Sequence, residues 1–195
     1  MLTKIFKTSL LFLFFFNLQI ASAFEITVKH LSGRVFQKHT SADPYAISEG
    51  KYQLSSETSI LTFLDGQFFA ETEDKIEVRM KEESIVSFTG KSEFEARKGV
   101  VGFKNLSGSI LIKTPHVDFI LNEGIVVIKS NSVITRICII KGNCLFERAL
   151  GSIKLQEGQE IAFAGGKTSI PYKMSDELRY TWYWVDPSKE PSLMN

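Results

Sequence analysis

The sequence is short of the residues from which catalytic and metal sites are built. It holds three histidines, His30, His39 and His116, and no two of them have a spacing that would place two imidazoles on one zinc ion. His116 and Asp118 would share a strand face, but a surface polar pair explains them better than catalysis. No phosphate loop, nucleophile elbow or zinc quartet occurs. We therefore expect a protein that is not an enzyme and binds no metal or cofactor.

Long apolar runs are absent except near the N-terminus. Two lysines precede the run Leu10–Phe16, and the small residues Ala21-Ser22-Ala23 follow it, which is the order of a secretory signal. Asn17 ends the run well short of the roughly 20 residues that cross a membrane. We expect residues 1–23 to be a signal peptide, with cleavage near Ala23/Phe24, rather than an uncleaved anchor. The mature protein would then be periplasmic or secreted from a Gram-negative-type envelope.

The sequence also has no surplus of positive charge. Without residues 1–23 the chain has 172 residues, with 21 Lys and Arg against 22 Asp and Glu, a formal net charge of −1. Proteins that bind nucleic acid carry basic residues to neutralise phosphates. We therefore expect no nucleic-acid partner, and no transmembrane segment after the signal is removed.

What the sequence does have is a series of short, alternating, β-rich runs separated by Gly, Asn and Asp. This pattern is typical of strands and turns. Asp65-Gly66, between two apolar runs, is the signature of a hairpin. About a dozen strands predict an all-β roll or sandwich, with a β-solenoid as the alternative. The expected strands lie at 25–28, 59–64, 67–70, 75–80, 85–88, 93–97, 100–103, 109–113, 118–121, 125–129, 133–140, 144–148, 152–155 and 160–164.

Cysteine is scarce, with Cys138 and Cys144 alone. An even pair in an exported chain predicts a disulfide. A turn centred near Lys141 would place the two cysteines opposite each other, whereas a two-residue turn at Gly142-Asn143 would separate them. We expect the first arrangement, and hence a structural clip.

The C-terminal segment, 176–195, is rich in aromatic residues, and Ser175 or Asp176 could cap a short helix there. A final strand is the alternative. Trp182, Tyr183 and Trp184 could anchor the segment on the β domain or, less favourably, form a platform for binding sugars.

Several blocks of the sequence have an order and spacing that resemble the periplasmic domain of FecR-type proteins, the iron-dicitrate sensor regulators. The resemblance covers roughly residues 45–165. It is carried by Ile47–Ser55, by Ser59–Gly66, by Arg97–Phe103, by Ile112–Val117, by Asn122–Val127, by Thr135–Gly142 and by Leu155–Gln159.

This resemblance implies a FecR-like β domain over residues 24–175. FecR regulators carry a cytoplasmic segment and a membrane helix before this domain, whereas a signal peptide stands here. We therefore expect a non-catalytic module that binds or scaffolds another envelope protein, of unknown identity. The alternatives are a sensory component of FecR-type envelope signalling and a module that binds peptidoglycan or another cell-wall polysaccharide.

Overall fold

The computed structural model describes residues 23–147 and 151–184, except for the side chains of residues 180, 181, 183 and 184. The expected signal peptide therefore lies almost wholly outside the described residues. The described elements are β1 (Phe24–Ser32), β2 (Val35–His39), β3 (Tyr45–Ala46), β4 (Gly50–Leu54), β5 (Thr58–Thr62), β6 (Gln67–Thr72), β7 (Glu77–Met80), β8 (Ile85–Gly90), β9 (Glu93–Asn105), β10 (Ile110–Lys113), β11 (Asp118–Ser130), β12 (Ile134–Phe146), β13 (Ile153–Gln156), β14 (Gln159–Ala164), β15 (Lys167–Thr168), β16 (Tyr172–Lys173) and α1 (Asp176–Trp184).

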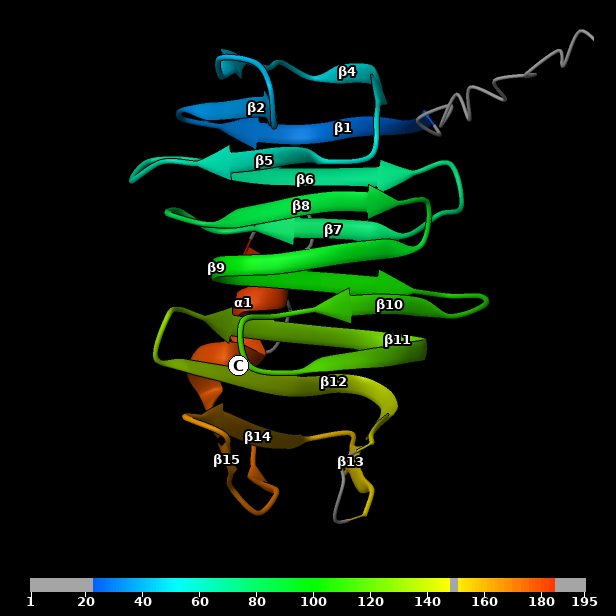
Figure 1. The fold of residues 1–195 in the computed structure, drawn as a ribbon, viewed down its shortest axis with the longest axis vertical. Helices are drawn as coiled ribbons and strands as arrows, with labels where there is room; N and C mark the ends of the chain where they lie inside the picture. Colours follow the sequence, from blue (N-terminus) through cyan, green and yellow to red (C-terminus); the bar gives the residue numbers. More distant parts are fainter. Residues whose placement is uncertain (1–22, 148–150, 185–195) are drawn as a thin grey trace, which may run out of the picture.

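The strands of the described chain form one continuous sheet that folds back on itself into two layers. Within the layers, the strands follow one another along the long axis in approximate chain order (Figure 1). The first layer runs β4-β1-β6-β7-β9-β11-β12-β14-β15, with β16 also pairing with β14. The second layer runs β3-β2-β5-β8-β9-β10-β11-β12-β13. Three long strands, β9, β11 and β12, belong to both layers, and the β9–β10 pair is parallel.

Paired glycines form the corner at which β11 and β12 pass from one layer to the other. Gly124 lies opposite Gly142 in the register of the two strands. Both have positive φ, 147° and 86°, and a Cβ on either residue would overlap the carbonyl oxygen of a residue beside the other. Glycine tolerates such a backbone at no steric cost. Two 13-residue strands can therefore turn this corner side by side.

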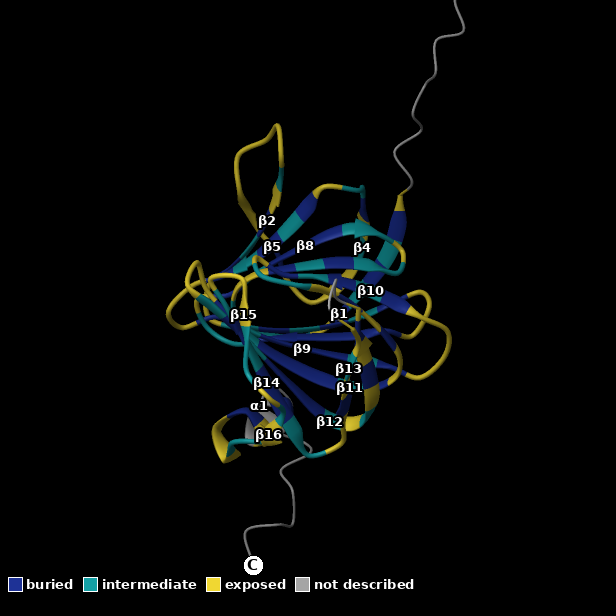
Figure 2. Cartoon of the chain, turned by 60° about the horizontal axis from the view of Figure 1, so that its bottom comes forward, coloured by how far each residue is buried: buried dark blue, intermediate teal, exposed yellow. Residues whose placement is uncertain are grey.

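The main core lies between the layers, because alternate residues of each strand point inward. In β5 the pattern is regular, with Thr58, Ile60 and Thr62 buried and the residues between them half-buried. A chain of phenylalanine rings crosses the upper part of the core; for example, the centroids of Phe88 and Phe94 are 5.5 Å apart. Figure 2 shows this division, with buried residues along the strands and exposed residues in the loops.

The expectation of an all-β fold with a short C-terminal helix is confirmed. The alternative of a final strand is wrong, since α1 spans Asp176–Trp184 and packs on the outer face of the first layer, over β9, β11 and β12. Ser175 precedes the helix, and its carbonyl accepts the first helical hydrogen bond, from the amide of Arg179. Asp176 and Glu177 complement the positive end of the helix dipole.

The hairpin expected at Asp65-Gly66 is wrong. The two strands that flank this turn, β5 and β6, do not pair with each other: β5 pairs with β2 and β8, and β6 pairs with β1 and β7. The turn carries the chain from the second layer to the first. Gly66 is needed there for close approach, because a Cβ would lie 2.5 Å from the carbonyl oxygen of Arg34.

Candidate interaction site

A row of five side chains runs across the outer face of the second layer. The register aligns Glu93 of β9, Leu111 of β10, Ile120 of β11, Leu145 of β12 and Lys154 of β13. Residues paired across strands point to the same face of a sheet. We call this set the outer row; it has three apolar side chains in the middle, an acid at one end and a base at the other.

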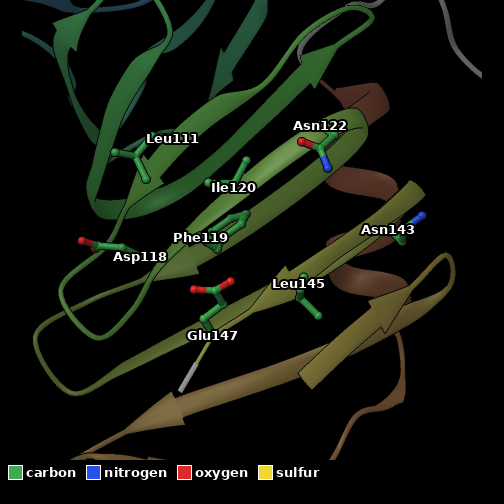
Figure 3. A pocket seen from close by; sticks show the side chains of 8 residues that line it. All are labelled: Leu111, Asp118, Phe119, Ile120, Asn122, Asn143, Leu145 and Glu147. Atoms are coloured by element: carbon green, nitrogen blue, oxygen red, sulfur yellow. The ribbon is translucent and has the colours of Figure 1, made fainter. Parts of the chain in front are cut away.

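The middle of the outer row is exposed to solvent. Ile120 is 51% exposed and Leu145 is 46% exposed, and they border a shallow hollow of about 360 Å³. Figure 3 shows Leu111, Ile120 and Leu145 on neighbouring strands. Exposed apolar side chains are common singly, but a contiguous group rimmed by polar residues marks a contact surface.

Polar side chains border the hollow on both sides. Asp118 and Glu147 lie at one end and Asn122 and Asn143 lie at the other (Figure 3). Such a charged and amide rim around an apolar centre is the usual anatomy of a protein–protein interface.

Charge on the outer row is partly paired within the chain. The Lys113 ammonium lies 2.5 Å from the Glu93 carboxylate. The hydrogen bond from Lys113 is the main cause that lowers the pKa of Glu93 below its usual value. Glu93 is therefore an anion at neutral pH, available to a cation from outside as well as to Lys113.

The outer face of the first layer is covered instead of exposed. Leu178 and Trp182 of α1 pack there against Val127 and Cys138. Gly102 of β9 makes room for the indole, since a Cβ at this position would lie 2.7 Å from a ring carbon of Trp182. The helix and sheet are therefore fitted to each other at this point.

A buried arginine also holds the helix. The guanidinium of Arg79 lies between two rings, 4.2 Å from the centroid of Trp182 and 4.6 Å from that of Phe69. It donates to the Trp182 carbonyl at 2.8 Å and to the Glu77 carboxylate at 2.9 Å. A cation near the last turn of a helix is favourable, and cation–π contacts strengthen when desolvated.

The start of the helix is held by a second buried charge, Glu160, whose side chain is not exposed at all. It accepts hydrogen bonds from the guanidinium of Arg136, from the hydroxyl of Tyr172 and from both the amide and the hydroxyl of Ser175. Burial acts to raise the pKa of Glu160, but these hydrogen bonds outweigh burial and lower it. The carboxylate therefore stays charged and fixes the residue before α1.

Trp182 cannot serve as a sugar-binding platform, because it is buried between the helix and the sheet. This corrects the less favoured interpretation of the C-terminal aromatic residues for Trp182 and agrees with the anchoring one. The side chains of Tyr183 and Trp184 lie outside the described residues.

His116 and Asp118 lie in different surroundings. The His116 ring is 2.9 Å from the hydroxyl of Thr135 and borders the loop at Ser132 and Val133. Asp118 lines the hollow beside the outer row. His116 and Asp118 thus border different hollows.

The predicted disulfide is wrong: Cys138 and Cys144 are free thiols. The segment between them is not a turn but part of the continuous strand β12, which bends at Gly142. Cys138 lies in the first layer beneath α1, whereas Cys144 faces the main core from the second layer. Burial raises the pKa of each thiol to about 12, with the charge of Glu160 adding to the shift at Cys138.

Two kinds of feature are absent from the described residues. Over residues 23–147 and 151–184, no group of three His, Cys, Asp or Glu side chains is arranged to hold a metal ion. In the same part of the chain, no helix combines the length and the apolar character needed to cross a membrane.

The outer row was missed by the sequence analysis. Leu111, Ile120 and Leu145 lie on three strands, and sequence alone does not give the register that aligns them. The alternation in Asp118–Leu121 places Ile120 on the opposite face of the strand from Phe119 and Leu121. This alternation could have indicated that Ile120 is exposed.

The fold is similar to that of solved structures. Two crystal structures of a protein described as "a putative anti-sigma factor from Parabacteroides distasonis" match 66% of this chain with a TM-score of 0.54 and 11% identity. The match spans less than two thirds of that protein, 65% and 64% of its length in the two structures. This likeness shows a shared fold. No family model matches the chain, and no curated protein matches it.

Proposed function

We propose that this chain is a non-catalytic protein-binding or scaffolding module of the bacterial cell envelope, and that the outer row is its contact surface. The exposure of Ile120 and Leu145 within a charged rim is the observation that carries the proposal. The other large apolar face, on the first layer, is already covered by α1. The secretory pattern of residues 1–23 supports a location outside the cytoplasm.

The buried charged groups support a role without chemistry. Arg79 and Glu160 are the most deeply buried charged side chains of the described residues, and both hold the ends of α1. Buried charged groups also occur at catalytic sites, but there they face a cleft. Here their partners are the helix and the strands around it.

A sensory role in FecR-type envelope signalling is the second candidate. The order of the sequence motifs favours it, and so does the fold likeness to a protein described as an anti-sigma factor. A sensor would also need a contact surface on this domain, so the two candidates differ in the partner and not in the surface.

Site-specific photo-crosslinking tests the proposal. A photoreactive amino acid replaces Ile120 in the full chain, the cells are irradiated, and the adducts are identified by mass spectrometry. We expect a protein adduct from the envelope fraction. The control places the same amino acid at Ile170, which is 83% exposed and outside the outer row.

Two results would contradict the proposal. One is an adduct pattern at position 120 that is the same as at position 170. The other is recovery of the chain from the cytoplasm. A membrane protein that responds to signals, found as the adduct, would favour the sensory candidate.

A further inference from the structure

We propose that the partner at the outer row is a second copy of this chain, an inference that rests on the proposed function of that surface. The order of charges across the row is complementary to itself. Glu93 and Lys154 stand at opposite ends, with three apolar side chains between them. A surface that contacts its own copy through a two-fold axis must be complementary to itself.

Consider two copies whose second layers face each other across a two-fold axis parallel to the strands. This axis reverses the order of the row, so Glu93 of each copy faces Lys154 of the other. Ile120, in the middle, faces Ile120 of the second copy. Two sheets that pack face to face with nearly aligned strands lie about 10 Å apart, which the apolar side chains fill.

The neighbouring row obeys the same symmetry. Lys113 of β10 lies opposite Asp118 of β11 in the register of the two strands. Glu147 lies next in this row, directly after the end of β12 and two residues beyond Leu145. Reversal of the order brings Lys113 opposite Glu147 of the second copy. The ion pair between Lys113 and Glu93 in one copy then joins the cross-copy pairs into a network of alternating sign.

Charge also selects against the other arrangement. A two-fold axis perpendicular to the strands would keep the order of the row, so Glu93 would face Glu93 and Lys154 would face Lys154. Like charges in close apposition across an interface oppose association. Of the two face-to-face arrangements, the strand-parallel axis alone makes the ends of the row attractive.

The strand-parallel axis leaves one contact between like charges. The axis runs along β11, which carries both Ile120 and Asp118, so each of these residues faces its own copy. Asp118 of one copy faces Asp118 of the other. Removal of this charge should strengthen the dimer, which is an effect that a merely structural role of Asp118 would not produce. The inference therefore predicts both weakening and strengthening variants.

Charge complementation is the decisive test, measured by sedimentation of the full chain at several concentrations. Glu93→Lys alone makes both ends of the row basic, so each end contact joins two cations. Lys154→Glu alone makes both ends acidic, so each end contact joins two anions. Each variant should raise the dimer dissociation constant about tenfold, equivalent to roughly 1.4 kcal/mol. A mixture of the two variants makes every end contact attractive, so it should form mixed dimers.

Two further variants complete the test. Ile120→Lys should make the chain monomeric, whereas Asp118→Asn should lower the dissociation constant several-fold. Ile170→Lys, outside the outer row, is the matched control and should leave the dimer intact. Circular dichroism of each variant checks that the fold survives, since all these positions are exposed or half-exposed.

The outcomes separate this inference from the proposed function. A wild-type chain that stays monomeric at all concentrations, or a mixture that fails to complement, would overturn the dimer. If the photo-crosslink at Ile120 then joins the chain to a different protein, the binding module stands. If it joins the chain to no protein, both are overturned.

Discussion

At the scale of single residues, polar side chains decide how this molecule is held together. Arg79 and Glu160 lie on strands, where the sequence alternation would place polar residues toward water. Arg79 is buried against Trp182 of α1, and Glu160 is buried among Arg136, Tyr172 and Ser175, so each charge has several partners. A buried charge without partners would cost several kcal/mol. Loss of one partner is therefore more damaging here than at an exposed ion pair.

Glu160 should make the stability of the protein depend on pH. Hydrogen bonds lower its pKa in the folded state below the ordinary value of 4.5, against the opposing effect of burial. Its contribution is therefore complete above about pH 4.5 and is lost as the pH falls through the lower, folded-state pKa. We expect Glu160→Gln to reduce the stability at pH 7 and to flatten its fall in acid.

Urea denaturation at pH 7 and at successively lower pH values measures this effect. Glu157→Gln is the control, because Glu157 is exposed and lies in the loop before β14. A wild-type acid dependence that is unchanged in Glu160→Gln would show that other carboxylates govern it.

At the scale of elements, α1 packs on the first layer through a close contact between Trp182 and Gly102. The indole of Trp182 rests against Gly102, with Arg79 beside it. The short helix has nine residues, too few for stability in isolation. Its stability must come from this packing.

A double-mutant cycle tests that dependence. Gly102→Ala should cost about 1 to 3 kcal/mol by overpacking against Trp182. In a Trp182→Ala background the same change should cost much less, because the clash is gone, giving a coupling of about 1 kcal/mol or more. Urea denaturation measures each corner of the cycle. Gly90→Ala is the control, since a Cβ there would make only an ordinary contact, 3.6 Å from Glu93. If the costs of Gly102→Ala and Trp182→Ala were additive, the close packing of Trp182 on Gly102 would be contradicted.

The elements also show what the sequence could and could not predict. Alternating runs located most of the strands, because burial of one face imposes a period of two. The prediction omitted β2 and β4, and it divided each of the long strands β9, β11 and β12 into two. The hairpins predicted from the turn residues at Asp65-Gly66 and at Lys141-Gly142-Asn143 are wrong, because the first turn joins the two layers and the second segment lies within β12. Such residues mark a change of chain direction, but they do not say whether the next strand pairs with the last or enters the other layer.

The outer row and the buried charges could not be predicted for a related reason. The outer row depends on the register in which five consecutive strands pair, which the sequence does not give. The burial of Arg79 depends on the contact of β7 with α1, which is distant in the sequence. The aromatic anchor at Trp182 was predictable because one residue type is enough to suggest burial.

At the scale of the whole molecule, the corner glycines keep the two layers in one sheet. Gly124 and Gly142 sit opposite each other, where β11 and β12 leave the first layer for the second. Because both strands cross together, the hydrogen-bonded pair continues from one layer to the other. The outer row, on the second layer, is thereby fixed relative to the helix on the first.

Gly142→Ala should destabilise the whole fold. The residue has a φ of 86°, and a Cβ would overlap the Glu123 carbonyl, so strain and collision add. We expect a loss of about 3 kcal/mol or more, seen as a lower midpoint in urea. Gly158→Ala is the matched control: its φ is 76°, but open space surrounds it, so its cost should be confined to the strain of about 1 to 2 kcal/mol. Equal losses for the two variants would show that the corner is not tightly packed.

The two free thiols of β12 have a consequence for the route by which the protein is made. A fold without a cross-link needs no electron acceptor to form, so it can be reached in reducing surroundings. Once folded, Cys138 and Cys144 are shielded by burial and held as thiols rather than reactive thiolates. Before folding they are six residues apart on an open chain and can be joined by an oxidant. In an oxidising compartment the yield of native protein therefore depends on two rates. Strand pairing must bury the sulfurs faster than an oxidant links them.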